Sequence, residues 1–201
     1  VSGCSEKGVY ANTNATNGYG LYTDDRLYVG TSMDNGSITS FCINDGSTEL
    51  EPGDLVCISG DYSASPLDPD NNIIVNIRKS DMDSADAVFG VVLHKVVYRS
   101  QVKRTMDGEP QQDRSFEYVD GDAQPGDYLR VTVFGPADVK VDPSDAYDAG
   151  ERLTTGESGL ARPVEIREFE GIQLAENVGT IGKALEQSDG SGYLKVFVNC
   201  R

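Results

Sequence analysis

His94 is the only histidine of the chain, and it is the first residue to consider for catalysis because imidazole is the most frequent general base. It lies in the segment GVVLHKVV, which predicts a β-strand, and no G-x-S-x-G, P-loop or H-E-x-x-H pattern is present. A lone histidine on a strand is far more often a packed or surface residue than a base. Among 33 acidic residues, a glycosidase-like carboxylate pair picked by eye has little meaning. We therefore predict no catalytic residue and no enzymatic activity.

The four cysteines are Cys4, Cys42, Cys57 and Cys200. They form no C-x-x-C pair, and the whole chain has a single histidine, which argues against a zinc site. An even number of cysteines in an acidic chain rich in Asn and Thr favours disulfides and an oxidising compartment. We predict a Cys42–Cys57 bridge across a short hairpin-like segment and a Cys4–Cys200 bridge near the termini, within one subunit or between subunits. Four buried free thiols are the alternative.

Carboxylates that could hold calcium occur in two expected loops. They are Asp68 and Asp70 in DPDNN, and Asp81 and Asp83 with Asp86 just downstream. Neither segment matches the twelve-residue EF-hand loop, so the alternative is Asp and Asn side chains that bond their own backbone in turns. We predict no obligatory cofactor, with calcium as the ion that these residues would bind.

The charge of the chain limits its partners. Seventeen basic against 33 acidic residues give a formal net charge of -16. Such a chain repels phosphates, so we predict no nucleic acid and no anionic membrane surface as partner. No segment approaches the roughly 20 apolar residues of a membrane-spanning helix, so we also predict no membrane insertion. The first residue is Val rather than Met, which favours a processed protein or an excised fragment.

The elements that would position these residues are mostly strands. The absence of Trp and the 22 Gly residues are typical of many short strands joined by tight turns. Helical signals are weak and are confined to residues 80–87 and 163–178. Segments rich in β-branched or aromatic residues predict strands at 37–43, 54–59, 72–78, 87–100, 127–135, 137–142 and 192–200.

A weak internal repeat links turns to strands. EPGDLV (51–56), QPGDYL (124–129) and DAGERL (148–153) share the order Pro or Ala, Gly, acid, any residue, aliphatic. Pro or Ala favours the first corner of a tight turn and Gly the positive φ of the second, after which a strand begins. VFGVVL (88–93) and TIGKAL (180–185) each place Gly inside a strand, which indicates a bulge or a close backbone approach.

Residues 98–122 predict a hairpin that projects from the body, because YRSQVKRTM and RSFEYV can pair around DGEPQQD. The hairpin holds four of the 17 basic residues. We predict that it is a contact arm for the acidic face of a neighbouring subunit, with a merely solvated hairpin as the alternative. The basic residues are Arg99, Lys103, Arg104 and Arg114.

The tract GVYANTNATNGYGLYTDDRLYVG, residues 8–30, carries Gly-hydrophobic-Tyr twice. A strand of this composition cannot bury its own backbone groups and rings, so it needs a partner. We predict that it adds to a sheet edge of the next subunit. Its expected assembly residues are Val9, Tyr10, Tyr19, Leu21, Tyr22 and Tyr28.

The order of these segments resembles a β-rich C-terminal module of bacterial surface proteins and phage tail fibres or spikes. LEPGDLV, IRKSDMDSADAVFGVV, AQPGDYLRVTVFGPADVKVD, AGERLTTGESGLARPV and VGTIGKALEQSDGSGYLKVFV carry the resemblance, and residues 8–30 are similar to the Gly/Tyr tracts that precede this module. The resemblance implies a fibrous, extracellular and oligomeric protein. Some related tail-spike modules are self-cleaving assembly domains. This chain departs from the pattern in its four cysteines and its single short Tyr/Gly tract.

Together these observations predict an all-β protein: an antiparallel sandwich or barrel over residues 34–201, with the projecting hairpin at 98–122, preceded by an extended assembly segment over residues 1–33. We expect an extracellular, cell-surface or virion structural subunit that assembles with itself into a filament by strand addition, stabilised by disulfides. One alternative is the receptor- or glycan-binding tip of a trimeric fibre, in which tyrosines offer stacking faces to a surface glycan. The other is a self-cleaving tail-spike domain.

Overall fold

The structure, a computed structural model, describes residues 33–34, 36–70, 72–104, 110–176 and 179–200. The chain divides into two units, residues 1–31 and 32–201, and every described residue belongs to the second unit. Cys4 and the predicted assembly residues of the N-terminal tract therefore lie outside the described residues, and their roles stay predictions. These tract residues are Val9, Tyr10, Tyr19, Leu21, Tyr22 and Tyr28.

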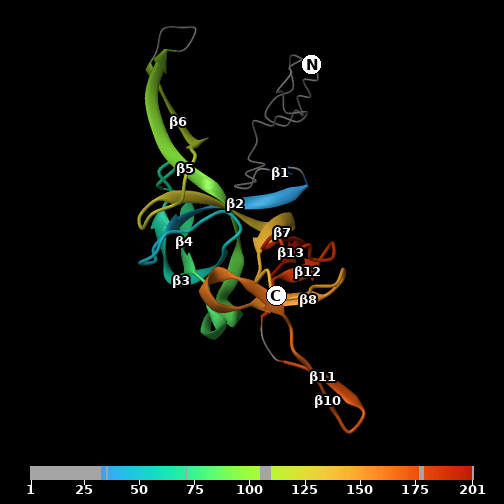
Figure 1. Ribbon diagram of the computed structural model, residues 1–201. Helices are drawn as coiled ribbons and strands as arrows, with labels where there is room; N and C mark the ends of the chain where they lie inside the picture. The colour runs from blue at the N-terminus through green and yellow to red at the C-terminus, as the bar shows by residue number, and fades with distance from the viewer. Residues whose placement is uncertain (1–32, 35, 71, 105–109, 177–178, 201) are drawn as a thin grey trace, which may run out of the picture. The chain divides into compact units, whose positions relative to one another are not determined.

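The fold is all-β, as predicted (Figure 1). Each expected strand is present, and the two expected at 127–135 and 137–142 form one long strand, β7. The strands are β1 (Met33–Asp34), β2 (Ser37–Asn44), β3 (Leu55–Ala64), β4 (Ile73–Lys79), β5 (Val88–Arg104), β6 (Pro110–Tyr118), β7 (Tyr128–Lys140), β8 (Arg152–Thr155), β9 (Ala161–Pro163), β10 (Ile166–Phe169), β11 (Ile172–Ala175), β12 (Gly182–Ala184) and β13 (Tyr193–Asn199). Two short 3₁₀ helices, η1 (Met82–Ala87) and η2 (Glu157–Gly159), connect described strands.

Five strands close into a barrel. Their order is β2-β4-β3-β5-β7, and β7 pairs again with β2, so the sheet returns to its first strand. The β2–β4 pair is parallel and the other four pairs of the barrel are antiparallel. Closure satisfies the edges of these strands, which would otherwise be free to pair with other chains. Of the two predicted architectures, sandwich or barrel, the structure has the barrel.

One hydrophobic cluster fills the barrel, and each of the five strands contributes to it. Because side chains alternate between the faces of a strand, Val56 and Val92 point inward while their neighbours Leu55 and Val91 point outward. The outward pair belongs to a second cluster. The inner cluster consists of Cys42, Leu50, Val56, Ile77, Val92, Ala123, Leu129 and Val131.

Strand β7 carries the fold from the barrel into a second layer. Its residues from Tyr128 to Phe134 pair with β2, and those from Phe134 to Lys140 pair with β13. Gly135, with φ +104°, lies where one pairing gives way to the other. The sheet then continues through β13, β12 and β8, which are labelled in Figure 1, to β9. Side chains of this layer pack on Leu55 and Val91, so the second layer covers the outer face of β3 and β5.

The three predicted turns share one geometry. Gly53, Gly126 and Gly150 have φ of +89°, +88° and +89°, as the repeat predicts. In each turn the N–H of the acidic residue donates to the carbonyl three residues earlier at 2.9–3.1 Å. The acidic side chain accepts the N–H of that first residue at 2.8–3.1 Å. Each turn also makes two hydrogen bonds to one residue of a neighbouring strand. The Gly N–H donates to the carbonyl of that residue, and the carbonyl of the acidic residue accepts its N–H. The bonded residue is Val92, Asn44 or Ala184 for the three turns in order.

Two of these turns belong to matching larger motifs. Gly90 pairs with Val56, three residues after Gly53, and Gly182 pairs with Leu153, three residues after Gly150. Gly90 and Gly182 are close backbone approaches, as predicted: a Cβ on Gly90 would lie 2.3 Å from the carbonyl oxygen of Thr132. The same fold element is therefore used twice, once in the barrel and once in the second layer.

Asp54, the acid of the first turn, is the buried centre of an ion network between the two layers. Its side chain is 2% exposed, and its oxygens lie 2.8 Å from Lys79 Nζ and 2.9 Å from Lys140 Nζ. Lys140 also pairs with Glu51 at 2.5 Å. This bond to Lys140 lowers the pKa of Glu51, while in Lys140 the bonds to both acids outweigh burial and raise its pKa.

The helix expected at 163–178 is wrong. Residues 166–169 and 172–175 form the two-stranded sheet of β10 and β11. The turn between them is Glu170-Gly171, with φ of +51° and +80°. Two consecutive residues with positive φ are typical of the turns that close tight hairpins, and they are incompatible with a helix. The other helical signal, at 80–87, corresponds to η1.

Tyr147 gives the second layer a measurable dependence on alkaline pH. It is 1% exposed, and its hydroxyl donates to the carbonyl of Ala161 at 3.1 Å. Burial, together with the Asp145 carboxylate, raises its pKa to about 12 from an ordinary value of 10.0. A raised pKa stabilises the fold fully below pH 10.0, and this stabilisation is lost as the pH approaches about 12.

We expect ionisation of Tyr147 to lower the free energy of unfolding by roughly 2–3 kcal/mol. Denaturant titrations below pH 10.0 and at about pH 12 would measure this fall. Tyr147→Phe should remove this part of the pH dependence at an initial cost of about 1–2 kcal/mol, because the Ala161 carbonyl loses its donor. Identical alkaline profiles for the two proteins would contradict the assignment.

Candidate assembly surface

The β10–β11 hairpin presents an apolar face that no described residue covers. All eight of its strand residues are exposed. Arg167 lies opposite Leu174, and Phe169 lies opposite Ile172. Because alternate cross-strand pairs share a face, these four side chains lie on one side of the hairpin. Phe169, Ile172 and Leu174 are 63%, 61% and 53% exposed, which is unusual for large apolar residues on one small face.

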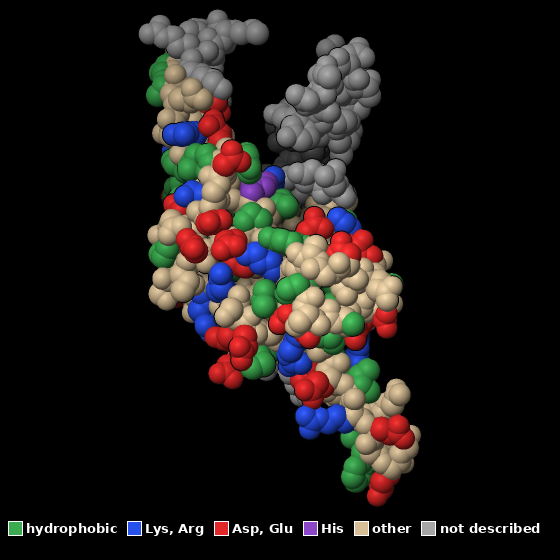
Figure 2. Space-filling view, viewed as in Figure 1, with side chains coloured by type: hydrophobic (Ala, Val, Ile, Leu, Met, Phe, Trp, Pro, Cys, Tyr) green, Lys and Arg blue, Asp and Glu red, His purple; other side chains and the backbone are tan. Residues whose placement is uncertain are grey.

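The hairpin is held at its base. Arg162 makes a two-pronged bond to the carboxylate of Glu176 at 2.6 and 3.0 Å, and Glu176 also accepts the backbone N–H of Glu165 at 2.9 Å. The bond to Arg162 lowers the pKa of Glu176. A bidentate bond between Arg and a carboxylate holds the two side chains in one relative orientation, in addition to pairing their charges. Figure 2 shows hydrophobic side chains next to acidic ones on this hairpin, on a face of the protein where acidic and basic side chains are interspersed.

The predicted hairpin at 98–122 is present as β5 and β6, and its pairing begins slightly earlier, at Val96 with Tyr118. Pairing of β5 with β7 ends at Val96, so the rest of β5 pairs with β6 alone and extends past the barrel wall (Figure 1). Phe116 anchors it, with ring centroids 4.4 Å from Phe41 and 5.1 Å from Tyr128. On this hairpin Val102 is 71% exposed and Tyr118 is 60% exposed.

The two basic residues of this hairpin whose side chains are described, Arg99 and Arg114, are bonded within the chain. Arg99 Nε lies 3.4 Å from the Glu117 carboxylate. Arg114 donates to the backbone carbonyl of Leu67 at 3.3 Å and to Gln112 at 2.8 Å. The side chains of Lys103 and Arg104 lie outside the described residues. Docking of these four residues on an acidic neighbour stays a prediction.

The predicted Cys42–Cys57 bridge is wrong for this structure, in which both residues are buried free thiols. They lie on β2 and β3, and β4 runs between these strands. Cys42 is in register with Val75 and Cys57 with Arg78, so they are also offset by three residues, or about 10 Å, along β4. A disulfide needs Cα atoms within about 7 Å.

Cys200 is also a free thiol, and burial raises its pKa to about 11. A thiol with that pKa is protonated near neutral pH and therefore a weak nucleophile. Its predicted partner, Cys4, lies outside the described residues, so the Cys4–Cys200 bridge, within one subunit or between subunits, stays a prediction.

Among the described residues, none of the predicted calcium residues belongs to a cluster of three or more acidic side chains. The Asp68 carboxylate accepts the Asn72 amide at 3.1 Å, and Asp70 and Asp83 are exposed. Asp81 precedes η1, where its bonds to Ser84 chiefly lower its pKa. In the described part of the chain, three acidic side chains do lie within 4.8 Å of one another, and they are Glu49, Glu51 and Asp122. Calcium binding stays a prediction.

His94 lies on β5, in register with Arg130 of β7. It is half-buried, and its ring packs edge-on against Tyr118 with centroids 5.0 Å apart. His94 is thus a packed residue on a strand, one of the two positions, packed or surface, that the sequence favours.

Sequence reasoning missed the apolar face of β10–β11 because it assigned the segment to a helix. The signal was Gly171 in the middle of 163–178, preceded by Glu-Phe-Glu and followed by Ile-Gln-Leu, in each of which polar and apolar residues alternate. Among the described residues, no helix has the length and hydropathy required to cross a bilayer.

No protein-family model and no curated protein matches this sequence. Among solved structures, the chain is similar to the C-terminal fragment of gene product 12 of bacteriophage phi29, with a TM-score of 0.37 and 14% sequence identity. The match covers 81% of this chain and 99% of the phage fragment. A likeness of this size establishes no shared function.

Proposed function

We propose that this chain is a structural subunit that assembles with copies of itself, and that the apolar face of β10–β11 is a contact between copies. The observation that carries the proposal is the exposure of Phe169, Ile172 and Leu174 on one face of a hairpin. A lone two-stranded hairpin is only marginally stable in water. Because these side chains are already 37–47% covered, burying the rest of the three contributes roughly 3–5 kcal/mol before the cost of association. In this proposal the protein works without a cofactor or a catalytic group.

The charge of the chain restricts the kind of contact that two copies can make. Copies with a net charge of -16 repel one another, so a contact between them has to be apolar or already paired. The one charged residue on the apolar face, Arg167, pairs with Glu165 at 2.8 Å. On the β5–β6 hairpin, Arg99 is likewise paired with Glu117. The apolar face of β10–β11 can therefore approach another copy without bringing an unpaired charge of that face into the contact.

The finer form of the proposal is a filament at a cell surface or on a virion. In it, residues 1–33 would add as a strand to the next subunit, and β10–β11 would supply a second, apolar contact. Strand addition supplies backbone hydrogen bonds, whereas an apolar face supplies burial, so the two contacts are complementary.

The test removes the apolar face and leaves the body of the protein intact. We expect the triple variant Phe169→Ser, Ile172→Ser, Leu174→Ser to shift the molar mass in light-scattering chromatography from oligomer to monomer. Because all three side chains are exposed, the melting temperature of the monomeric body should change by less than about 2 °C.

The matched control is Glu168→Ser with Gln173→Ser, which changes the opposite face of the same hairpin. This control should keep the oligomer. A triple variant with the mass of the unmodified protein, or an unmodified protein that is monomeric at every concentration, would overturn the proposal.

A further inference from the structure

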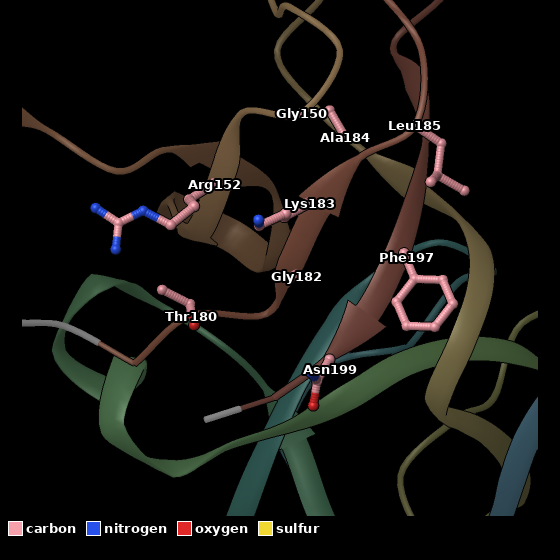
Figure 3. Close-up of a pocket in the computed structure, with 9 residues that line it drawn as sticks. All are labelled: Gly150, Arg152, Thr180, Gly182, Lys183, Ala184, Leu185, Phe197 and Asn199. Atoms are coloured by element: carbon pink, nitrogen blue, oxygen red, sulfur yellow. The ribbon is translucent and has the colours of Figure 1, made fainter.

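A second candidate site lies on the outer surface of the second layer, apart from both hairpins. It is a cavity of about 590 Å³ at the strands β8, β12 and β13. This volume is within the usual range for small-molecule sites. Figure 3 shows Arg152 and Lys183 on one side of β12, above Thr180, with Leu185 and Phe197 on the other side.

Arg152 and Lys183 are directly opposite each other on neighbouring strands. Like charges in this position repel and destabilise a sheet. The chain has 33 acidic residues, yet within the described ranges none forms an ion pair with either cation. By contrast Lys195, on β13 of the same layer, pairs with Asp138 at 2.8 Å. The two unpaired cations form a local positive site on an acidic protein.

The rest of the lining is suited to a ring that carries hydroxyl groups. Phe197 is in register with Lys183 and is 37% exposed, and Leu185 is 48% exposed. Aromatic faces of this kind stack on the apolar face of a sugar. Thr180 and Asn199 add a hydroxyl and an amide that can bond to sugar hydroxyls. The site is built on strands that approach closely at Gly182, where a Cβ would lie 2.1 Å from the carbonyl oxygen of Phe197.

We propose that this cavity binds an acidic saccharide, with Arg152 and Lys183 holding its carboxylate while Phe197 and Leu185 face its ring. Two cations side by side match the two oxygens of a carboxylate. A long polyanion is disfavoured because the protein as a whole carries a net charge of -16, whereas a single acidic sugar meets only the local positive site. The inference is independent of self-assembly, since it uses no hairpin residue.

The test compares glucuronic acid, galacturonic acid and glucose as probes, by saturation-transfer NMR and calorimetry on the full chain. We expect the uronic acids to bind about tenfold or more tightly than glucose, which has the ring but not the charge. Arg152→Gln with Lys183→Gln should abolish this preference. The matched control Lys195→Gln removes a neighbouring but already paired charge, and it should leave binding unchanged.

Three outcomes would overturn the proposal. The first is no uronic acid binding, or equal binding by the Arg152→Gln, Lys183→Gln variant. The second is inorganic phosphate binding as tightly as glucuronic acid, which would mean a general anion site. The third is displacement of glucuronic acid by a peptide of residues 165–176, which would make the cavity a contact between subunits. The triple hairpin variant should bind uronic acids normally, so failure of this proposal and failure of self-assembly are distinguishable.

Discussion

Gly90→Ala and Gly182→Ala are each expected to lower the free energy of unfolding by about 3 kcal/mol. A Cβ at these positions would lie 2.3 Å from the carbonyl oxygen of Thr132 and 2.1 Å from that of Phe197. Both clashing atoms are backbone atoms of a paired strand, so they cannot move without opening the sheet. For a domain of this size the melting temperature should fall by roughly 6–12 °C, which thermal unfolding followed by circular dichroism would measure.

Gly150→Ala is the control, because it separates close approach from backbone conformation. Gly150 has φ +89°, but no other atom lies within 4 Å of the position of its Cβ. Alanine there carries only the strain of a positive φ, about 1–2 kcal/mol. If Gly90→Ala were as mild as Gly150→Ala, the close packing of β5 against β7 would be wrong.

Much of the fold could be predicted from the sequence because its turns and close approaches depend on local patterns around glycine. Pro-Gly-Asp followed by an aliphatic residue specifies a turn and the start of a strand through contacts among neighbouring residues alone. Alternation predicts a strand by equally local means, and Gly inside a strand predicts a close approach. The turns at Gly53, Gly126 and Gly150 and the approaches at Gly90 and Gly182 agree with these local rules.

The features that could not be predicted depend on which strands pair with each other in the folded protein. Closure of the barrel joins β2 to β7, roughly 90 residues apart in sequence, and no local pattern specifies that pairing. The same limit applies to Arg152 and Lys183, which become neighbours only because β8 pairs with β12. It also explains the wrong disulfide, since Cys42 and Cys57 are close in sequence but separated by β4 in space. The segment 163–178 failed for a local reason, because its turn at Glu170-Gly171 was overlooked.

Asp54→Ala is the second substitution with a large expected effect, a loss of about 3–5 kcal/mol in the free energy of unfolding. Asp54 is 2% exposed and bonds to both Lys79 and Lys140, whose side chains are 23% and 15% exposed. Its removal leaves two partly buried ammonium groups with less compensation, and the backbone N–H of Glu51 loses its acceptor. Denaturant titration of the monomeric protein would measure the loss.

The repeated turn supplies the control series for this prediction, because the same position holds Asp54, Asp127 and Glu151. All three side chains accept the same backbone bond within their turns. Asp127 adds one ion pair, to Lys95 at 2.5 Å, and its side chain is 31% exposed. Alanine at Asp127 should therefore cost about 1–2 kcal/mol, and alanine at Glu151 about 1 kcal/mol. Equal losses at all three positions would mean that the turn bond alone stabilises the fold, whereas a decrease in this order assigns the difference to the buried ion network that joins the barrel to the second layer.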